Sequence, residues 1–209
     1  MVRHKMVWLA SWPRSGNTFL RTIMWQCFGL RSGSIYPGDM ANNRQLEEYV
    51  GHVEDKNNLF VDGNVPLIKT HEPPSDNSPA IYVVREGKTA TLSLCQFYRD
   101  TPPEFVVEGR HRFGTWTNHL QLWKPWERPD TLLLRYEDIE NDMPATLGKI
   151  SLFLGVEILK DTLPPRDAIA GIDGRIVKKE GVAKPDFSGT LSARFEEING
   201  EMLRKMGYR

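Results

Sequence analysis

Cysteine is scarce in this sequence, which has only Cys27 and Cys95 among its 209 residues. Two cysteines cannot build the disulfide framework of a small secreted protein, and their spacing matches no metal-ligand motif. The sequence also lacks an Asn-x-Ser/Thr acceptor for N-glycosylation. These absences favour a reducing compartment, so we expect a cytoplasmic protein.

Long apolar runs and a net charge are missing too. No apolar run approaches the ~18 residues that span a membrane. The apolar stretch from Met6 to Trp12 follows a basic start but is too short for a signal peptide. The 27 Lys and Arg residues balance 27 Asp and Glu residues, which argues against the basic face of a general nucleic-acid binder. We therefore expect neither a membrane nor nucleic acid as a partner.

The composition that is present is typical of a globular protein, with 40% hydrophobic and 26% charged residues. No internal repeat, low-complexity tract or Ser/Gly linker divides the chain. We therefore expect residues 1–209 to form a single domain, and the composition leaves its oligomeric state open.

Short apolar runs alternate along the chain with segments of helical periodicity. Apolar strands of this kind predict an α/β fold, in which helices cover both faces of a central parallel sheet. Residues 31–60 are polar and irregular and receive no assignment. The expected strands are 5–11, 65–69, 80–84 and 131–134, and the expected helices are 19–28, 88–98, 116–123, 144–154 and 191–206.

The loop from Pro13 to Thr18 connects the first expected strand to the first expected helix. Free N–H groups at a helix N-terminus, a glycine and two hydroxyls together make an anion site. Arg14 adds a guanidinium that can bind two phosphate or sulfate oxygens. The loop lacks the G-x-x-x-x-G-K-[ST] pattern of nucleoside triphosphatases. An ordinary strand-to-helix turn is the alternative interpretation of this segment.

Two further strand ends carry polar side chains. Lys69 and His71 follow the second expected strand, and Arg85 follows the third, with Ser93 eight residues later. Taken singly, Arg85 could pair with Glu86, and Ser93 could bond to its own helix. Because ligands bind beyond the carboxyl ends of parallel strands, we expect these residues to share one site.

These motifs, taken in order from about Val7 to Tyr208, resemble those of the sulfotransferases that use 3′-phosphoadenosine 5′-phosphosulfate (PAPS). The resemblance rests on the whole ordered set, because each motif alone is weak. The matching segments are Pro13–Phe19, Ile68–His71, Tyr82–Arg85 with Ser93, Gly114–Trp116 with Trp123, and Leu134–Asp138. The P-loop-like strand–loop–helix of that family would bind the 5′-phosphosulfate.

The resemblance implies a role for each matching residue. Arg14 would bind the 5′-phosphosulfate, and Arg85 with Ser93 would hold the 3′-phosphate. Phe19 stands where the family has a Trp that stacks on adenine, so the aromatic face is kept but shortened. The remaining cofactor-binding residues that it implies are Ser15, Gly16, Asn17, Thr18 and Tyr136.

The resemblance also implies the chemistry. His71 would act as general base on an acceptor hydroxyl, while Lys69 and Arg14 would stabilise negative charge. The reaction would be an in-line sulfuryl transfer without a metal ion, leaving 3′-phosphoadenosine 5′-phosphate (PAP). The expected acceptor is a hydroxyl or amine of a small molecule or carbohydrate. The acceptor loops are expected in residues 31–60 and 99–115. The aromatic residues in or beside these loops are candidates to line the acceptor pocket, namely Tyr36, Tyr49, Phe97, Tyr98, Phe105 and Phe113.

The sequence departs from the family near its C-terminus. Where the family has an Arg-Lys-Gly segment over the 3′-phosphate, this chain has Lys178, Lys179 and Gly181, with Glu180 between them. A solvated charged loop is the alternative there. Two other functions also stay open: a metal-dependent nucleotide kinase, and a nucleotide-binding module without catalytic activity.

Overall fold

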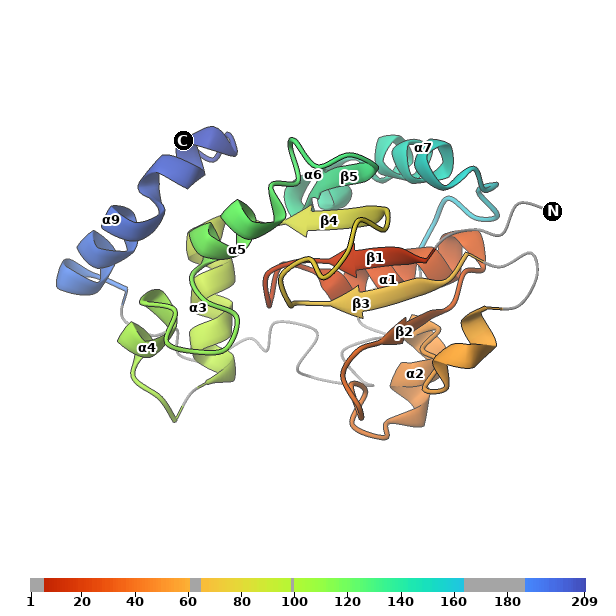
Figure 1. Ribbon diagram of the computed structural model, residues 1–209, viewed down its shortest axis with the longest axis horizontal. Helices are drawn as coiled ribbons and strands as arrows, with labels where there is room; N and C mark the ends of the chain where they lie inside the picture. The colour runs from red at the N-terminus through yellow and green to blue at the C-terminus, as the bar shows by residue number, and fades with distance from the viewer. Residues whose placement is uncertain (1–5, 61–64, 99, 164–186) are drawn as a thin grey trace.

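The computed structural model describes residues 6–60, 65–98, 100–163 and 187–209. Its centre is a five-stranded sheet with the strand order β2-β3-β1-β4-β5 (Figure 1). Every neighbouring pair of these strands is parallel, so the predicted parallel sheet is confirmed. The strands are β1 (Val7–Ala10), β2 (Ser32–Ser34), β3 (Leu67–Thr70), β4 (Ala80–Val84) and β5 (Thr131–Arg135).

Helices cover both faces of this sheet because successive strand side chains point to opposite sides. Ile81 and Val83 of β4 pack in one cluster with α1 (Asn17–Phe28), α6 (Tyr136–Asn141) and α7 (Met143–Leu154). Tyr82 and Val84 pack in the other, with α3 (Gly87–Phe97), α4 (Pro103–Val107), α5 (Trp116–Trp123) and α9 (Gly189–Lys205). Figure 1 shows this second group of helices at the end of the sheet toward which β4 points.

The predicted helices all have counterparts in the structure, with ends displaced by a few residues. α1 ends where Gly29 adopts a left-handed conformation that glycine reaches without strain. In α7 Pro144 lies in the first turn, where its missing N–H has no intrahelical partner to lose. Amphipathic helices of this length are specified by their own sequence pattern.

Residues 31–60, which received no assignment from the sequence, contain β2, α2 (Arg44–Val50) and a short 3₁₀ helix, Lys56–Leu59. The strand Ser32-Gly33-Ser34 has no apolar alternation, yet all of it is buried at the edge of the sheet. A Cβ on Gly33 would lie 3.0 Å from the side chains of both Lys56 and Leu59. This strand therefore exists because of its packing, and a periodicity argument could not detect it.

The connections from β1 and β4 leave the sheet on opposite faces, since α1 packs in one cluster and α3 in the other. β1 and β4 are adjacent, so their carboxyl ends form a topological switch point of the sheet. Such a switch point is where parallel sheets bind ligands. In the part of the chain that the structure describes, no helix is long and apolar enough to span a membrane.

Candidate functional site

The loop between β1 and α1 requires glycine at position 16. Gly16 caps α1 with φ 101°, and a Cβ there would lie 2.4 Å from Cδ2 of Tyr136. Asn17 fixes the loop from its other side, because its amide donates to the carbonyl of Leu9 at 2.9 Å and to Ser11 Oγ at 3.3 Å. The Asn17 amide nitrogen thus bonds within the protein, and Gly16 packs against the ring of Tyr136.

Ser15 retains unused hydrogen-bonding capacity in this loop. The residue is 1% exposed, and its Oγ has no hydrogen-bond partner among the described residues. A buried hydroxyl without a partner costs about 1–3 kcal/mol, so native structures keep few of them outside ligand sites. Together with the N-terminus of α1, this hydroxyl fits an anion such as a phosphate or sulfate group.

Arg14, Arg85 and Ser93 meet beside the carboxyl ends of β1 and β4. Nε of Arg14 donates to Ser93 Oγ at 3.1 Å, and Nη1 of Arg85 donates to the carbonyl of Arg14 at 3.2 Å. The guanidinium of Arg85 also lies 4.4 Å from the centre of the Tyr136 ring. The sequence prediction separated Arg14, on the 5′ group, from Ser93, on the 3′ group. The structure joins the two side chains, so the two predicted subsites are contiguous.

Phe19 and Tyr136 form an aromatic pair beside this loop. Their ring centres are 6.0 Å apart, and the rings meet edge to face. The pair lies on α1 and α6, one turn beyond the loop, where a flat heterocycle could pack against it. The predicted residues Lys178, Lys179 and Gly181 lie outside the described residues.

His71 follows β3 and is held in one orientation. Its Nδ1 donates to the carbonyl of Ser11 at 2.8 Å, and its backbone N–H donates to Tyr36 Oη at 2.8 Å. Since a carbonyl can only accept, the proton is on Nδ1 and Nε2 keeps its lone pair. Burial, assisted by the nearby charge of Lys69, lowers the pKa of His71 to about 3. The imidazole is therefore neutral at pH 7 and can accept a proton at Nε2.

A second histidine, His119, holds the backbone of His71 in place. Nε2 of His119 donates to the carbonyl of His71 at 3.0 Å, and Tyr82 Oη donates to its Nδ1 at 2.7 Å. Trp123 donates to the next carbonyl, that of Glu72, at 2.9 Å. Burial lowers the pKa of His119 to about 4, which keeps it in the neutral form that these bonds require. The sequence prediction missed this support, although His119 and Trp123 lie on one face of a predicted helix.

Lys69 is 8% exposed and pairs with a residue that the sequence prediction did not include. Its Nζ lies 2.5 Å from Oδ1 of Asp39, whose Oδ2 lies 2.6 Å from Nη1 of Arg21. Asp39 belongs to the irregular stretch between β2 and α2, where no motif marked it. Arg21 falls on the predicted first helix as a charged residue, and only the fold reveals that it is buried.

Aromatic rings surround the open side of His71. Tyr36 stacks on it with ring centres 5.8 Å apart, and Phe113 meets it edge-on at 5.9 Å. Two of the predicted acceptor residues, Tyr36 and Phe113, are thus in contact with His71. The others lie further out: Tyr98 and Phe105 pack on His111, Tyr49 packs in a separate cluster, and Phe97 is exposed near Arg14.

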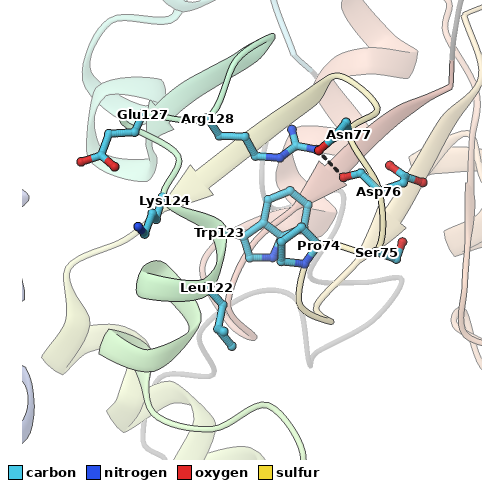
Figure 2. Close-up of a pocket in the computed structure, with 9 residues that line it drawn as sticks. All are labelled: Pro74, Ser75, Asp76, Asn77, Leu122, Trp123, Lys124, Glu127 and Arg128. Atoms are coloured by element: carbon cyan, nitrogen blue, oxygen red, sulfur yellow. Dashed lines mark hydrogen bonds between the residues drawn. The ribbon is translucent and has the colours of Figure 1, made fainter.

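A separate cavity of about 600 Å³ lies between the β3–β4 connection and the end of α5. Figure 2 shows Arg128 reaching toward the Asp76 side of this cavity, where it donates to the Asp76 carbonyl at 2.9 Å. It also donates to the Ser78 carbonyl at 2.8 Å, so its donors support the connection. None of the predicted site residues that the structure describes lines this cavity. No three His, Cys, Asp or Glu residues are grouped as metal ligands anywhere in the described ranges.

Comparison with known proteins gives a consistent result. A family model described as "Sulfotransferase domain" matches residues 4–166. Sulfotransferase 4A1 of Homo sapiens is 28% identical over 185 residues, which cover 78% of this chain and 64% of that protein. Sulfotransferase 1A1 of Bos taurus is 30% identical over 188 residues, covering 74% of this chain and 60% of that protein. The chain thus spans less than two thirds of the length of these curated relatives.

Solved structures share the fold. A mouse sulfotransferase, SULT7A1 complexed with PAP, superposes with a TM-score of 0.63 at 20% identity and covers 97% of this chain and 86% of its own. Retinol dehydratase in a complex with retinol and PAP has a TM-score of 0.62 at 19% identity and covers 98% of this chain and 82% of its own. At this level of identity the likeness establishes the arrangement of strands and helices.

Proposed function

Because this chain belongs to the sulfotransferase family, we propose that it moves a sulfuryl group from PAPS to a hydroxyl or amine of a small-molecule or carbohydrate acceptor. The observation that carries the proposal is the meeting of Arg14, Arg85 and Ser93 at the carboxyl ends of β1 and β4. Cations and a hydroxyl at that position suit a ligand with more than one anionic group. The PAP in both solved neighbours described above supports the same ligand class.

In this proposal each part of the site at the ends of β1 and β4 binds one part of PAPS. Arg85 and Ser93 bind the 3′-phosphate, and Arg14 lies between it and the 5′ end. The unpartnered Ser15 hydroxyl and the first N–H groups of α1, from Gly16, Asn17 and Thr18, bind the 5′-phosphosulfate. Phe19 and Tyr136 provide aromatic surface for the adenine. Lys178, Lys179 and Gly181 stay predictions, since they lie outside the described residues.

His71 is the proposed general base. When bound, PAPS supplies the sulfuryl group and a good leaving group. Nε2 of His71 accepts the proton of the acceptor, while the bond from Nδ1 to Ser11 keeps the ring in place. The low pKa of His71 keeps it unprotonated at pH 7 but makes it a weak base, so it requires a closely positioned acceptor. Lys69 and Arg14 stabilise negative charge on the oxygens around the transferred group.

Two other functions are less well supported. A nucleotide kinase would use the first loop for ATP, and that loop lacks the Gly-Lys-Ser/Thr of such enzymes. A binding module without activity would have no need of an imidazole with a fixed tautomer and an available Nε2. Calorimetric titration with PAP and with ATP separates these classes. We expect tight binding of PAP and weak binding of ATP without magnesium dependence, and the reverse order would contradict the proposal.

The base is tested by His71→Asn, because the asparagine amide can still donate to Ser11. We expect kcat to fall by about 10²–10⁴-fold, since a general base contributes that much. PAP affinity in calorimetry should stay close to that of the wild type. Glu48→Gln is the matched control, because Glu48 forms an exposed ion pair with Arg44 on α2. Turnover of His71→Asn at the wild-type rate would remove His71 from this role.

Domain extent and location complete the proposal. We assign all of residues 1–209 to one sulfotransferase domain, although the family model ends at residue 166. This is supported by Tyr208, whose hydroxyl donates to Glu137 of α6 at 2.9 Å. A cytoplasmic location is proposed from Cys27 and Cys95, which are both free thiols. Size-exclusion chromatography would determine the oligomeric state, and fractionation of cells would test the location.

A further inference from the structure

We propose that Asp39 is a positioning residue of the active site, whose carboxylate keeps the Lys69 ammonium charged and fixed at the end of β3. The use that catalysis makes of that charge rests on the function proposed above. The ion pair itself does not, and it can be measured without any sulfuryl transfer. Neither the family motifs nor the spacing of charges in the sequence marked Asp39.

The geometry gives each oxygen of Asp39 its own cation. Oδ1 lies 2.5 Å from Nζ of Lys69 and Oδ2 lies 2.6 Å from Nη1 of Arg21. The side chains of Lys69, Asp39 and Arg21 are 10%, 7% and 0% exposed. One buried carboxylate thus compensates the charges of two buried cations. Removing one partner of such a group leaves a buried charge without compensation.

Arg21 makes this carboxylate rigid. Its Nε donates to Ser32 Oγ at 2.8 Å, and its Nη2 donates to the Ser32 carbonyl at 3.2 Å and to Nδ1 of His52 at 2.6 Å. Arg21 lies on α1, the helix that follows the loop after β1. The regular backbone of this helix fixes the position of Arg21. Asp39 itself lies in a turn outside helices and strands. Arg21, fixed by α1, therefore holds Asp39, and Asp39 in turn holds Lys69.

The charges around Lys69 come from several elements. Arg21 of α1 and Arg14 of the first loop are cations, the ring of Tyr36 lies 5.6 Å from Nζ, and His71 lies two residues further along the chain. Burial lowers the pKa of Lys69, Asp39 opposes that effect, and both arginines add to it. Within the described part of the chain, Asp39 is the anion that acts against the loss of the Lys69 proton. Without it, Lys69 would face two arginines and a neutral imidazole.

The pairing leaves Lys69 able to act on a ligand. An ammonium has three N–H donors, and Asp39 takes one of them. Lys69 is the penultimate residue of β3, and its Nζ lies 5.6 Å from the centre of the Tyr36 ring, which stacks on His71. We infer that Asp39 acts through Lys69 and does not touch PAPS or the acceptor.

The test is the pH profile of kcat/KM for Asp39→Asn, with Glu48→Gln as the control. If Lys69 must be protonated, activity falls as pH rises through its pKa. Loss of a neighbouring opposite charge lowers such a pKa by about 1–3 units, so the alkaline limb should move to lower pH by that amount. The variant should approach wild-type activity at low pH. An equal loss of activity at every pH, as from a merely structural defect, would overturn the proposal.

A second measurement does not depend on activity. In full-length protein labelled with ¹⁵N-lysine, the Lys69 signal is identified by its loss in Lys69→Met. We expect an ammonium at pH 7.5 in the wild type and deprotonation at lower pH in Asp39→Asn. A neutral Lys69 in the wild type at pH 7.5, or the same titration in both proteins, would overturn the proposal. If Asp39→Asn does not fold, the wild-type spectrum alone decides. Absence of sulfuryl transfer in the wild type would instead count against the proposed function and leave this result standing.

Discussion

Arg85 and Arg21 lie on opposite sides of β1 and are held in different ways. Arg85 is partly exposed and contacts the carbonyl of Arg14 and the ring of Tyr136. Arg21 is fully buried and shares the carboxylate of Asp39 with Lys69. Among the described residues, no carboxylate forms an ion pair with Arg85. A cation held by neutral groups keeps its charge for a ligand, whereas a buried cation requires a charge of opposite sign.

The difference extends to the neighbouring strands. On the β4 side, Arg14, Ser93 and Arg85 bond to each other at the end of the strand, with donors left for an anion. On the β3 side, His119 donates to the carbonyl of His71 and is itself held by Tyr82, while Asp39 holds Lys69. We therefore expect substitutions on the β4 side to weaken binding and substitutions on the β3 side to lower stability as well.

The largest effect is expected for Arg21→Met. This change removes four hydrogen bonds and leaves Asp39 with one cation in a buried place. Breaking a buried pair in this way costs about 3–5 kcal/mol, and the free energy of unfolding should fall by that amount. Urea denaturation measures it.

The matched control for Arg21→Met is Arg44→Met. Arg44 and Glu48 form an ion pair whose side chains are 88% and 68% exposed. Exposed pairs contribute little, so a change below about 1 kcal/mol is expected. Equal losses in the two variants would show that the burial of Arg21 does not matter, and would break the contrast between the two sides.

A smaller effect is expected for Arg85→Met. A hydrogen bond to a charged group contributes about 1.5–3 kcal/mol, so the affinity for PAP should fall by about 10–100-fold. Stability should change little, because the partners of Arg85 are a carbonyl and a ring. Calorimetry with PAP and with adenosine 5′-phosphate provides the measurement. If both ligands lose the same affinity, Arg85 does not bind the 3′-phosphate.

The smallest effect concerns His119 and pH. Its pKa is about 4 in the folded protein against 6.5 as the ordinary value, so the unfolded chain takes up the proton first. Its contribution to stability is present above pH 6.5 and is lost as pH falls toward 4, by about 1 kcal/mol at pH 5.5. In His119→Gln, the drop in the free energy of unfolding between pH 7.5 and 5.5 should be smaller than in the wild type by that amount. Identical drops would show that His119 does not titrate in this way.

Much of the site followed from the sequence because it lies where strands end. Arg14, His71, Arg85 and Ser93 are a few residues from strands or helices with strong apolar patterns, so their common edge of the sheet could be predicted. The start of α3 at Gly87 places Ser93 less than two turns into the helix, as expected. The contact between Arg14 and Ser93 was not predicted, since sequence spacing says nothing about the direction of long side chains.

The supporting residues could not be predicted in the same way. Asp39 lies in a turn, and β2 is a Ser-Gly-Ser segment without apolar alternation. His119 on α5 could equally have been a surface or a core histidine. Their roles depend on partners that are distant in sequence, such as Arg21 for Asp39 and Tyr82 for His119.

The sequence by itself determined the α/β architecture, the main helices and the cations and hydroxyls that follow the strand ends, because hydrophobic periodicity and strand ends are local properties. Only the tertiary structure decided which charges are buried, which tautomer His71 adopts and which carboxylate holds Lys69. The physical reason is that burial, and with it the need to compensate a charge, arises only when segments far apart in the chain pack together.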